Sequence, residues 1–289
     1  MSLVLGIEIT PRAVRGAFLK TALRGFEMER YAEEPIPQPT EEHSTTGLLR
    51  AAIAKLIAQG SRPPDRVIAA LDGQLASLRL IDLPLGVEKK IGEVLPGELG
   101  TVLPFDVDEA IIDYQIVGRD ETNLQLMTVA TPSQNVADRL RMLNAAGVDP
   151  RELAVGAAAF DGLSGLLPEA LDGRTVLVID VGASNTDFAV LSSGQCTFAR
   201  TLSGGMNLVE SRRRNQLGMS LQRTLASYRA QRSDEPTIIW LSGETSTMDS
   251  ARQWLTEQLG IECGRVPVPT APGADDETAP KFAKAAALA

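Results

Sequence analysis

Apolar residues follow the same order at the start of each half of the chain. The runs LVLGIEIT (Leu3 to Thr10) and TVLVIDVG (Thr175 to Gly182) are rich in Leu, Ile and Val, which predicts buried β-strands. Placing Glu8 on Asp180 aligns the residues that follow without a gap, at an offset of 172. A turn and two more strand-like runs come next in each half. The spacing therefore indicates a duplicated unit that opens with a three-strand meander.

After each meander the apolar spacing changes to the three- and four-residue spacing of a helix. In the first half this predicts a helix from Thr45 to Gln59 and a strand from Val67 to Leu71. In the second half it predicts a helix from Gln216 to Gln231, a strand from Thr237 to Leu241 and a helix from Thr247 to Leu259. Both halves thus have the order βββαβα, a ribonuclease-H-like topology, and the second half has little beyond it.

The first half also carries an insertion, over residues 72–131 or so. Its expected elements, with the helix that follows, are a strand Leu75 to Ile81, a helical stretch from Val87 that breaks at Pro96, strands near Ala110 to Val117 and Asn123 to Ala130, and a helix Ser133 to Ala146. A helix over residues 154–167 is expected to join the lobes, and a last helix to cover 281–289. We therefore expect a first lobe with an inserted subdomain over residues 1–170 and a second, minimal lobe over residues 171–289.

Composition and charge exclude several classes of protein. The chain has 289 residues, 44% hydrophobic and 22% charged, with no apolar run near the roughly 18 residues of a membrane span. A net charge of −9 argues against nucleic acid as a partner, because phosphate binding needs an excess of Lys and Arg. The only histidine, His43, lies in a polar stretch, which argues against histidine-based catalysis and His-ligated metals. Two cysteines, Cys196 and Cys263, favour a reducing compartment.

Three stretches resemble known families. VLVIDVGASNTDFAVL (176–191) and LSGGMNLV (202–209) resemble the second phosphate-loop region of the actin, hexokinase and Hsp70 superfamily. LPFDVDEAIIDYQIVG (103–118) resembles a stretch of the PilM pilus-assembly proteins and the related type II secretion L proteins (GspL), and is the more discriminating of the two signals. The resemblance covers most of the chain. It implies an α/β, actin-like fold of two linked lobes.

The resemblance also implies a role. In these families the domain is a scaffold at the inner membrane that recruits the cytoplasmic secretion or pilus ATPase and contacts other platform proteins. We expect a non-catalytic, cytoplasmic domain of a type II secretion L protein, tethered by a segment after Ala289, with a PilM-like pilus protein as the alternative. An active ATPase or sugar kinase of the same fold is the second alternative. A homodimer is left open.

By resemblance, the second hairpin contains the residues of a nucleotide site. Asp180 would orient a hydrated Mg²⁺, Gly182 would let the backbone approach a phosphate, and Ser184, Asn185 and Thr186 would donate hydrogen bonds to it. Such sites use backbone amides and carboxylates in this way. The other interpretation is that the hairpin keeps these residues for its own backbone geometry.

The rest of the nucleotide site departs from the family pattern. In the first hairpin Glu8 stands where an Asp is usual, and Pro11 has no N–H to offer a phosphate. Gly204 and Gly205 would either cradle a phosphate or turn the chain, and near the adenosine end only Gly243 remains of a usual pair. We expect a vestigial site that binds ATP with Mg²⁺ weakly or not at all.

One segment reverses the sign of the acidic chain. Residues 210–232 carry six arginines against one acid, and Arg212, Arg213 and Arg214 are consecutive. This pattern predicts either an ordinary solvated helix face or a docking surface for an acidic partner or the anionic membrane surface. Little chain fits between Leu208 and Gln216, where actin-like ATPases and PilM proteins insert a further subdomain. That shortening favours the L protein over PilM.

Overall fold

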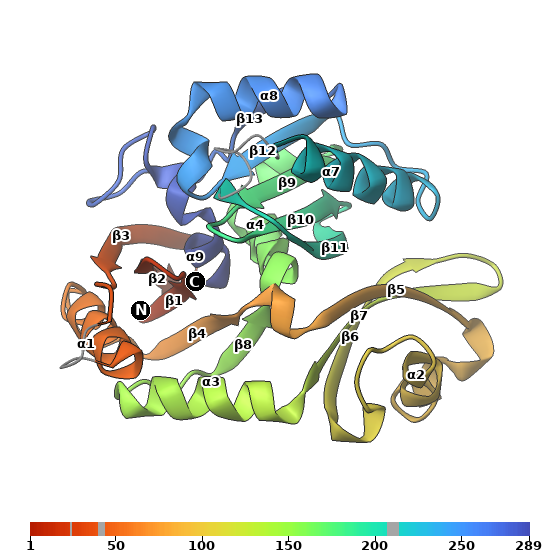
Figure 1. Ribbon diagram of the computed structural model, residues 1–289, viewed down its shortest axis with the longest axis horizontal. Coiled ribbons are helices and arrows are strands. Elements are labelled where there is room, and N and C mark those ends of the chain that lie inside the picture. Colours follow the sequence, from red (N-terminus) through yellow and green to blue (C-terminus); the bar gives the residue numbers. More distant parts are fainter. Residues whose placement is uncertain (24, 40–43, 207–213) are drawn as a thin grey trace.

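The computed structural model describes residues 1–23, 25–39, 44–206 and 214–289. Over these residues the chain forms two five-stranded mixed sheets and a three-stranded antiparallel sheet. Figure 1 shows the two larger sheets in separate lobes, with the smaller sheet extending to one side of the first. Arg212, Arg213 and His43 lie outside the described residues.

The first sheet has the strand order β3-β2-β1-β4-β8. Its strands are β1 (Ser2–Ile9), β2 (Ala13–Ala22), β3 (Gly25–Pro35), β4 (Arg66–Leu71) and β8 (Glu152–Val155). Leu3, Leu5 and Ile7 point to one face, where helices α1 (Thr45–Ile57) and α3 (Ser133–Ala145) cover them. Because side chains alternate along a strand, Gly6 and Glu8 point to the opposite face.

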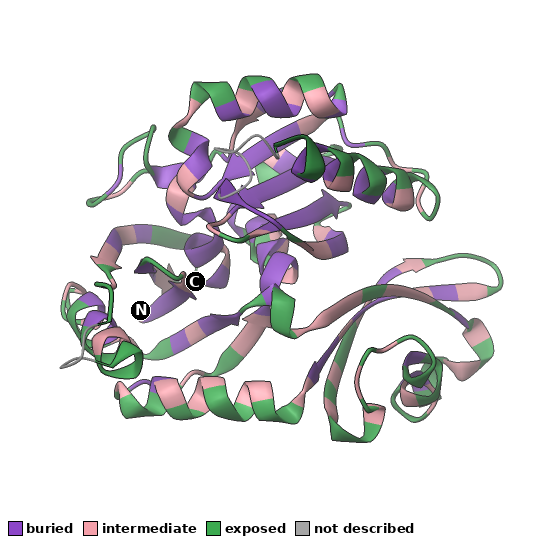
Figure 2. Ribbon diagram, viewed as in Figure 1, coloured by how far each residue is buried: buried purple, intermediate pink, exposed green. Residues whose placement is uncertain are grey.

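The second sheet repeats this plan with the order β11-β10-β9-β12-β13. Its strands are β9 (Val176–Val181), β10 (Asn185–Ser192), β11 (Gln195–Ser203), β12 (Ile238–Ser242) and β13 (Cys263–Arg265). Leu177 and Ile179 pack under helices α7 (Arg214–Arg229) and α8 (Asp249–Leu259). Figure 2 shows the two central strands β9 and β10 buried along nearly their whole length.

The strand registers repeat at the predicted offset. Glu8 pairs with Arg15 across β1 and β2, and Asp180 pairs with Asp187 across β9 and β10. Both pairs differ by 172 in residue number. The prediction of a duplicated three-strand meander is therefore confirmed, and each hairpin carries a carboxylate near the end of its first strand.

The insertion forms a small layered unit. It contains β5 (Ser77–Pro84), β6 (Ala110–Arg119) and β7 (Asn123–Pro132), and helix α2 (Ile91–Gly100). The expected break at Pro96 is wrong, because α2 continues through it. Ile91, Leu95 and Leu99 are buried against the sheet. Their packing outweighs the single backbone hydrogen bond that proline removes.

The segment that connects the lobes contains less helix than expected. Residues 154–155 end strand β8 and pair with β4. The chain then forms the 3₁₀ helix η4 (Gly156–Gly162) and the short helices α4 (Leu163–Leu166) and α5 (Pro168–Leu171). The expected single helix over 154–167 is therefore wrong, since its first residues complete the sheet.

The last helix returns to the first sheet. After the 3₁₀ helix η6 (Ala279–Phe282), helix α9 (Ala283–Leu288) lies against β1 and β2, and Figure 1 shows it beside the first strands. The backbones of α9 and β1 lie so close together that a Cβ on Gly6 would lie 2.0 Å from the carbonyl oxygen of Ala285. The division of the chain at residue 170 stays a prediction, and α9 is a segment of the second part that packs on the first.

Candidate functional site: a closed cleft between two hairpins

A small cleft lies where the two opening hairpins face each other. Its walls come from the turns β1–β2 and β9–β10, the end of β4, and α9. Its volume is about 60 Å³, whereas pockets that bury small molecules usually measure about 300–1,000 Å³. As it stands, the cleft has no room for a nucleotide.

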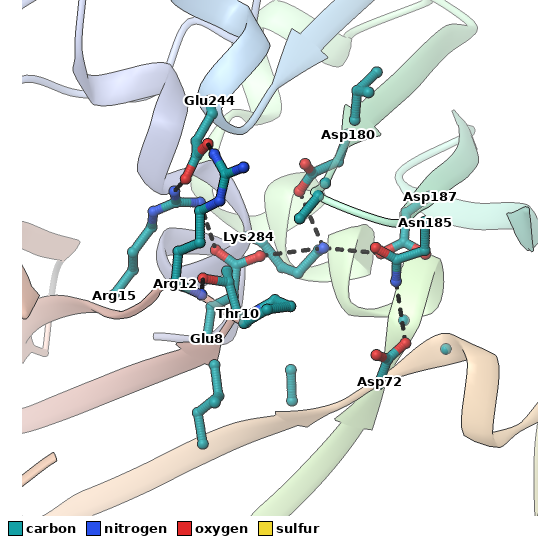
Figure 3. Close-up of a pocket in the computed structure, with 18 of the residues that line it drawn as sticks. Glu8, Thr10, Arg12, Arg15, Asp72, Asp180, Asn185, Asp187, Glu244 and Lys284 are labelled. Atoms are coloured by element: carbon teal, nitrogen blue, oxygen red, sulfur yellow. Dashed lines mark hydrogen bonds and ion pairs between the residues drawn. The ribbon is translucent and has the colours of Figure 1, made fainter. Parts of the chain in front are cut away.

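A lysine ammonium lies among three carboxylates that line the cleft. Lys284, on α9, places its Nζ 2.8 Å from Asp187 Oδ2, 3.0 Å from Asp180 Oδ2 and 3.3 Å from Glu8 Oε1. Figure 3 shows it pointing between these carboxylates. Burial alone would lower the pKa of Lys284, but the three carboxylates outweigh burial and hold that pKa well above its usual value. The ammonium is therefore charged.

One buried cation cannot neutralise three carboxylates. Burial and the charge of Asp180 raise the pKa of Glu8, against the opposing effect of Lys284 and Arg15. Arg15 supplies the second cation: its guanidinium lies 3.6 Å from Glu8, 3.3 Å from Glu33 and 2.8 Å from Glu244. Since Glu244 follows β12, this arginine also connects the two lobes.

The turn of the first hairpin uses its own hydrogen-bond donors. The Thr10 hydroxyl accepts from the amides of Ala13 (3.0 Å) and Arg12 (3.3 Å), while the Thr10 amide donates to the Ala13 carbonyl (2.9 Å). Pro11 has no amide hydrogen. This turn therefore has no amide from residues 10–13 left over for a phosphate.

Several polar groups of the second hairpin also form hydrogen bonds within the hairpin or with the Gly204 backbone. The Thr186 hydroxyl is buried and donates to the Gly204 carbonyl, and the Gly182 amide donates to the Asn185 carbonyl. Ser184 is exposed, and its carbonyl accepts from the Gly204 amide at 2.8 Å. The phosphate-binding roles expected for these residues stay predictions.

Two of the expected site residues, Gly205 and Gly243, lie where a side chain would clash. A Cβ on Gly205 would lie 2.2 Å from the Gly182 carbonyl oxygen, and one on Gly243 would lie 2.2 Å from Asp180 Oδ1. Gly243 also has a positive φ of 74°. Backbone geometry alone thus accounts for glycine at these positions.

A metal nucleotide does not fit this arrangement. Among the described residues, no set of three or more His, Cys, Asp or Glu is arranged to hold a metal ion. The carboxylates that the resemblance assigns to hydrated Mg²⁺ contact Lys284 instead. The amides of Thr10, Arg12 and Ala13 at the first turn are used within the turn, and the Arg12 guanidinium that also lines the cleft lies 3.7 Å from Glu244.

Comparison with known proteins decides the family. The profile described as type IV pilus assembly protein PilM matches residues 6–232. The chain belongs to the PilM family. A solved PilM–PilN type IV pilus biogenesis complex is 24% identical, with a TM-score of 0.81 over 99% of this chain and 97% of that one. The cytoplasmic domain of EpsL, an inner-membrane component of the Vibrio cholerae type II secretion system, is 14% identical, with a TM-score of 0.52 over 95% and 86%.

The fold prediction is confirmed. The ethanolamine utilization protein EutJ from Carboxydothermus hydrogenoformans, 11% identical, matches with a TM-score of 0.52 over 99% of this chain and 88% of that chain. At these identities the solved structures establish the actin-like fold alone. This PilM-family chain has no helix, within its described residues, that is long and apolar enough to cross a membrane.

In its described part, residues 214–232, the arginine-bearing segment is only partly a free surface. Arg229 pairs with Glu235 (2.9 Å) and Arg232 with Asp234 (2.9 Å). Arg232 also donates to Gln125 (2.8 Å) and Val117 (3.1 Å) in the insertion. Exposed Arg214 lies over the ring of Trp254 at 5.9 Å. The docking role of Arg212, Arg213 and Arg214 stays a prediction.

A second hollow opens on the first lobe between two sheet edges. It lies between β8, the edge of the first sheet, and β6, the edge of the inserted sheet, with a volume of about 510 Å³. Its described lining combines the apolar Val129 and Leu288 with the acidic Asp113, Glu152 and Asp161, and includes no Lys or Arg. We call this hollow the edge groove.

Sequence reasoning missed Lys284, Arg15 and Asp187. Lys284 is the only charge in the alanine-rich run AKAAAL of α9. A lone cation in a helix of small apolar residues is a signal of burial toward an anionic partner. The offset of 172 residues could have pointed to Asp187, because Asp187 stands in the second hairpin where Arg15 stands in the first.

Proposed function

We propose that this PilM-family protein is a non-catalytic scaffold that holds an inner-membrane partner of a pilus or secretion assembly platform. The observation that carries the proposal is the edge groove, which presents two sheet edges and acidic side chains beside a cleft too small for a nucleotide. The profile match favours the pilus alternative over the type II secretion L protein.

The partner we propose is a PilN-type inner-membrane protein. The solved relative is a PilM–PilN complex. Extended segments bind by adding a strand to an exposed sheet edge, and β6 is an edge strand whose residues 113–115 line the groove. Cytoplasmic segments of inner-membrane proteins carry an excess of Lys and Arg, which complements the exposed Asp113; the other two acids of the groove already have partners, Glu152 in Arg66 and Asp161 in the Cys196 amide. The chain would then work on the cytoplasmic face of the membrane.

Binding of the partner's cytoplasmic segment tests this proposal. Asp113 is exposed and lines the groove, so Asp113→Lys should weaken binding about tenfold by reversing one charge contact. Val129→Arg should block the apolar part of the groove. The matched control is Asp108→Lys, an exposed acid of the same insertion that does not line the groove. Calorimetry in which both groove variants bind like wild type would contradict the proposed site.

Recruitment of the cytoplasmic ATPase is the second part of the proposal. It is supported by the family resemblance and by the exposed Arg214 and Arg223 on α7. The double reversal Arg214→Glu/Arg223→Glu should weaken ATPase binding at low salt and leave thermal stability nearly unchanged, because exposed charges contribute little to folding. Loss of binding to anionic vesicles with ATPase binding intact would instead favour a membrane surface as the partner of these arginines.

The enzyme alternative has its own test. Micromolar ATP binding that Asp180→Ala abolishes would favour an active ATPase or kinase over a scaffold. We expect calorimetry to detect no such binding, because the cleft holds a lysine and the amides of the first turn are used within the turn.

A further inference from the structure

Three buried carboxylates converge on one point of the cleft. Glu8 comes from the first lobe, and Asp180 and Asp187 come from the second. Buried like charges repel strongly and require a compensating cation. The ammonium of Lys284 contacts all three, whereas Arg15 contacts only Glu8 among them.

The position of this ammonium is fixed by how α9 docks. The helix backbone touches Gly6 of β1 at one side, and a Cβ on Gly162 would lie 1.8 Å from the Ala287 carbonyl oxygen at the other. The ring of Phe160 lies 5.4 Å from Lys284 Nζ. Glycines thus allow α9 to approach at backbone distance, and the lysine cannot swing out while the helix stays docked.

We propose that Lys284 is a built-in counter-cation that closes the cleft. It holds Glu8 of one lobe against Asp180 and Asp187 of the other, in the place where the superfamily resemblance would put a hydrated divalent ion. A divalent cation enters only when α9 leaves. This inference concerns the chain alone and goes beyond the proposed scaffold function, so a failure of partner binding leaves it untouched.

The carboxylates could accept a metal if the lysine were gone. Their oxygens lie 2.8–3.3 Å from Nζ, and divalent ions bind oxygen at about 2.0–2.6 Å. For Mg²⁺, which binds oxygen at about 2.0–2.1 Å, the three side chains would have to move inward by about 0.7–1.3 Å. The wild-type protein excludes the metal because the ammonium already fills the site.

The experiment is thermal unfolding of Lys284→Met with and without millimolar Mg²⁺ or Mn²⁺. Methionine is unbranched like lysine and only one atom shorter, and it carries no charge. We expect Tm to fall by roughly 5–15 °C without metal, because a partner of buried charges is lost. Either metal should raise the Tm of the variant and leave that of wild type unchanged.

The matched control is Lys281→Met on the preceding turn, where the lysine pairs with Glu33 at 2.5 Å and is partly exposed. It should lose less stability and show no metal response. The double variant Asp187→Asn/Lys284→Met should be more stable than Lys284→Met, since one of the repelling carboxylates is neutralised. A Lys284→Met protein that melts like wild type, or a wild-type protein with the same metal response as the variant, would overturn the proposal.

Should Lys284→Met fail to fold, wild-type protein carries the test. Reductive methylation followed by mass spectrometry should label exposed Lys89 and leave Lys284 unmodified in the native state. Labelling of Lys284 at the rate of Lys89 would overturn the proposal.

Discussion

At the residue scale, the two strand-end carboxylates differ in the residues that face them. Glu8 and Asp180 occupy equivalent places in the two hairpins, but their cross-strand partners differ, Arg15 in one and Asp187 in the other. The first hairpin is thus internally neutralised, and the second carries two acids. Lys284, which lies outside the duplicated unit, supplies a positive charge to these two acids.

Asp65 gives a pH-dependent prediction at this scale. Hydrogen bonds from Arg62 and from the Leu3 amide, 2.7 Å away, hold the pKa of Asp65 well below its usual 3.8. Because the native pKa is lowered, the stabilisation is present above about pH 4 and lost as the pH falls further. Asp65→Asn should lower Tm at pH 7, and the difference from wild type should shrink toward about pH 3.

A substitution of Arg62 tests whether this arginine causes the lowered pKa of Asp65. Arg62→Ala should lower Tm at pH 7, and adding Asp65→Asn to it should cost less than Asp65→Asn costs in wild type. A Tm difference between wild type and Asp65→Asn that stays constant from pH 7 to about pH 3 would argue against the assigned pKa shift.

At the element scale, α9 is a six-residue helix whose place depends on glycine in the strand beneath it. Such a short helix is unstable alone, so its docking against β1 and β2 decides whether it forms. Gly6 and Gly162 provide the space for that docking. The element that carries Lys284 is therefore held by residues far away in the sequence.

Gly6→Ala should separate α9 from the sheet. The added Cβ would lie 2.0 Å from the Ala285 carbonyl oxygen and 2.9 Å from Leu288 Cβ, so the helix must shift at a cost of about 3 kcal/mol. Urea unfolding measures the loss, and hydrogen exchange should quicken in α9. Gly97→Ala in α2, where a Cβ meets nothing within 4 Å, should be neutral or stabilising by about 0.5–1 kcal/mol. Equal effects of the two substitutions would refute the docking argument.

At the scale of the whole molecule, single side chains tie the parts of the chain together. Asn185 donates to Asp72 at 3.1 Å across the cleft, and Arg15 reaches Glu244. Arg232, after α7, donates to the insertion at Val117, where the strand pairing of β6 shifts register. A bulge leaves a carbonyl outside the regular ladder, and the guanidinium satisfies it.

Arg232→Ala should loosen the insertion from the second lobe. We expect a loss of about 1–3 kcal/mol, because the Val117 carbonyl and Gln125 lose a charged donor, with faster hydrogen exchange in β6 and β7. Arg229→Ala, which removes an exposed pair with Glu235, should cost less than about 1 kcal/mol. If the two variants unfold alike and exchange in the insertion is unchanged, Arg232 is not a tie between these parts.

The sequence by itself determined the duplicated meander, the order of strands and helices, the insertion and the family. The first three follow from local periodicity and from the offset of 172 residues, which can be read without knowing any contact. The family follows from the resemblance of residues 103–118 to PilM and L-protein sequences. The sequence also located Asp180 and the glycines of the second hairpin, because the residues of a turn are neighbours in the chain and form a local motif.

Only the tertiary structure decided what those residues contact. Pro96 stays inside a helix because three side chains pack beneath it, and residues 154–155 become a strand because β4 is beside them. Lys284 enters the cleft because α9 returns to the first sheet, about 276 positions from Glu8 in the chain. No periodicity encodes such a return, since it depends on the energy of docking a short helix on distant glycines and of burying a cation among carboxylates from two lobes.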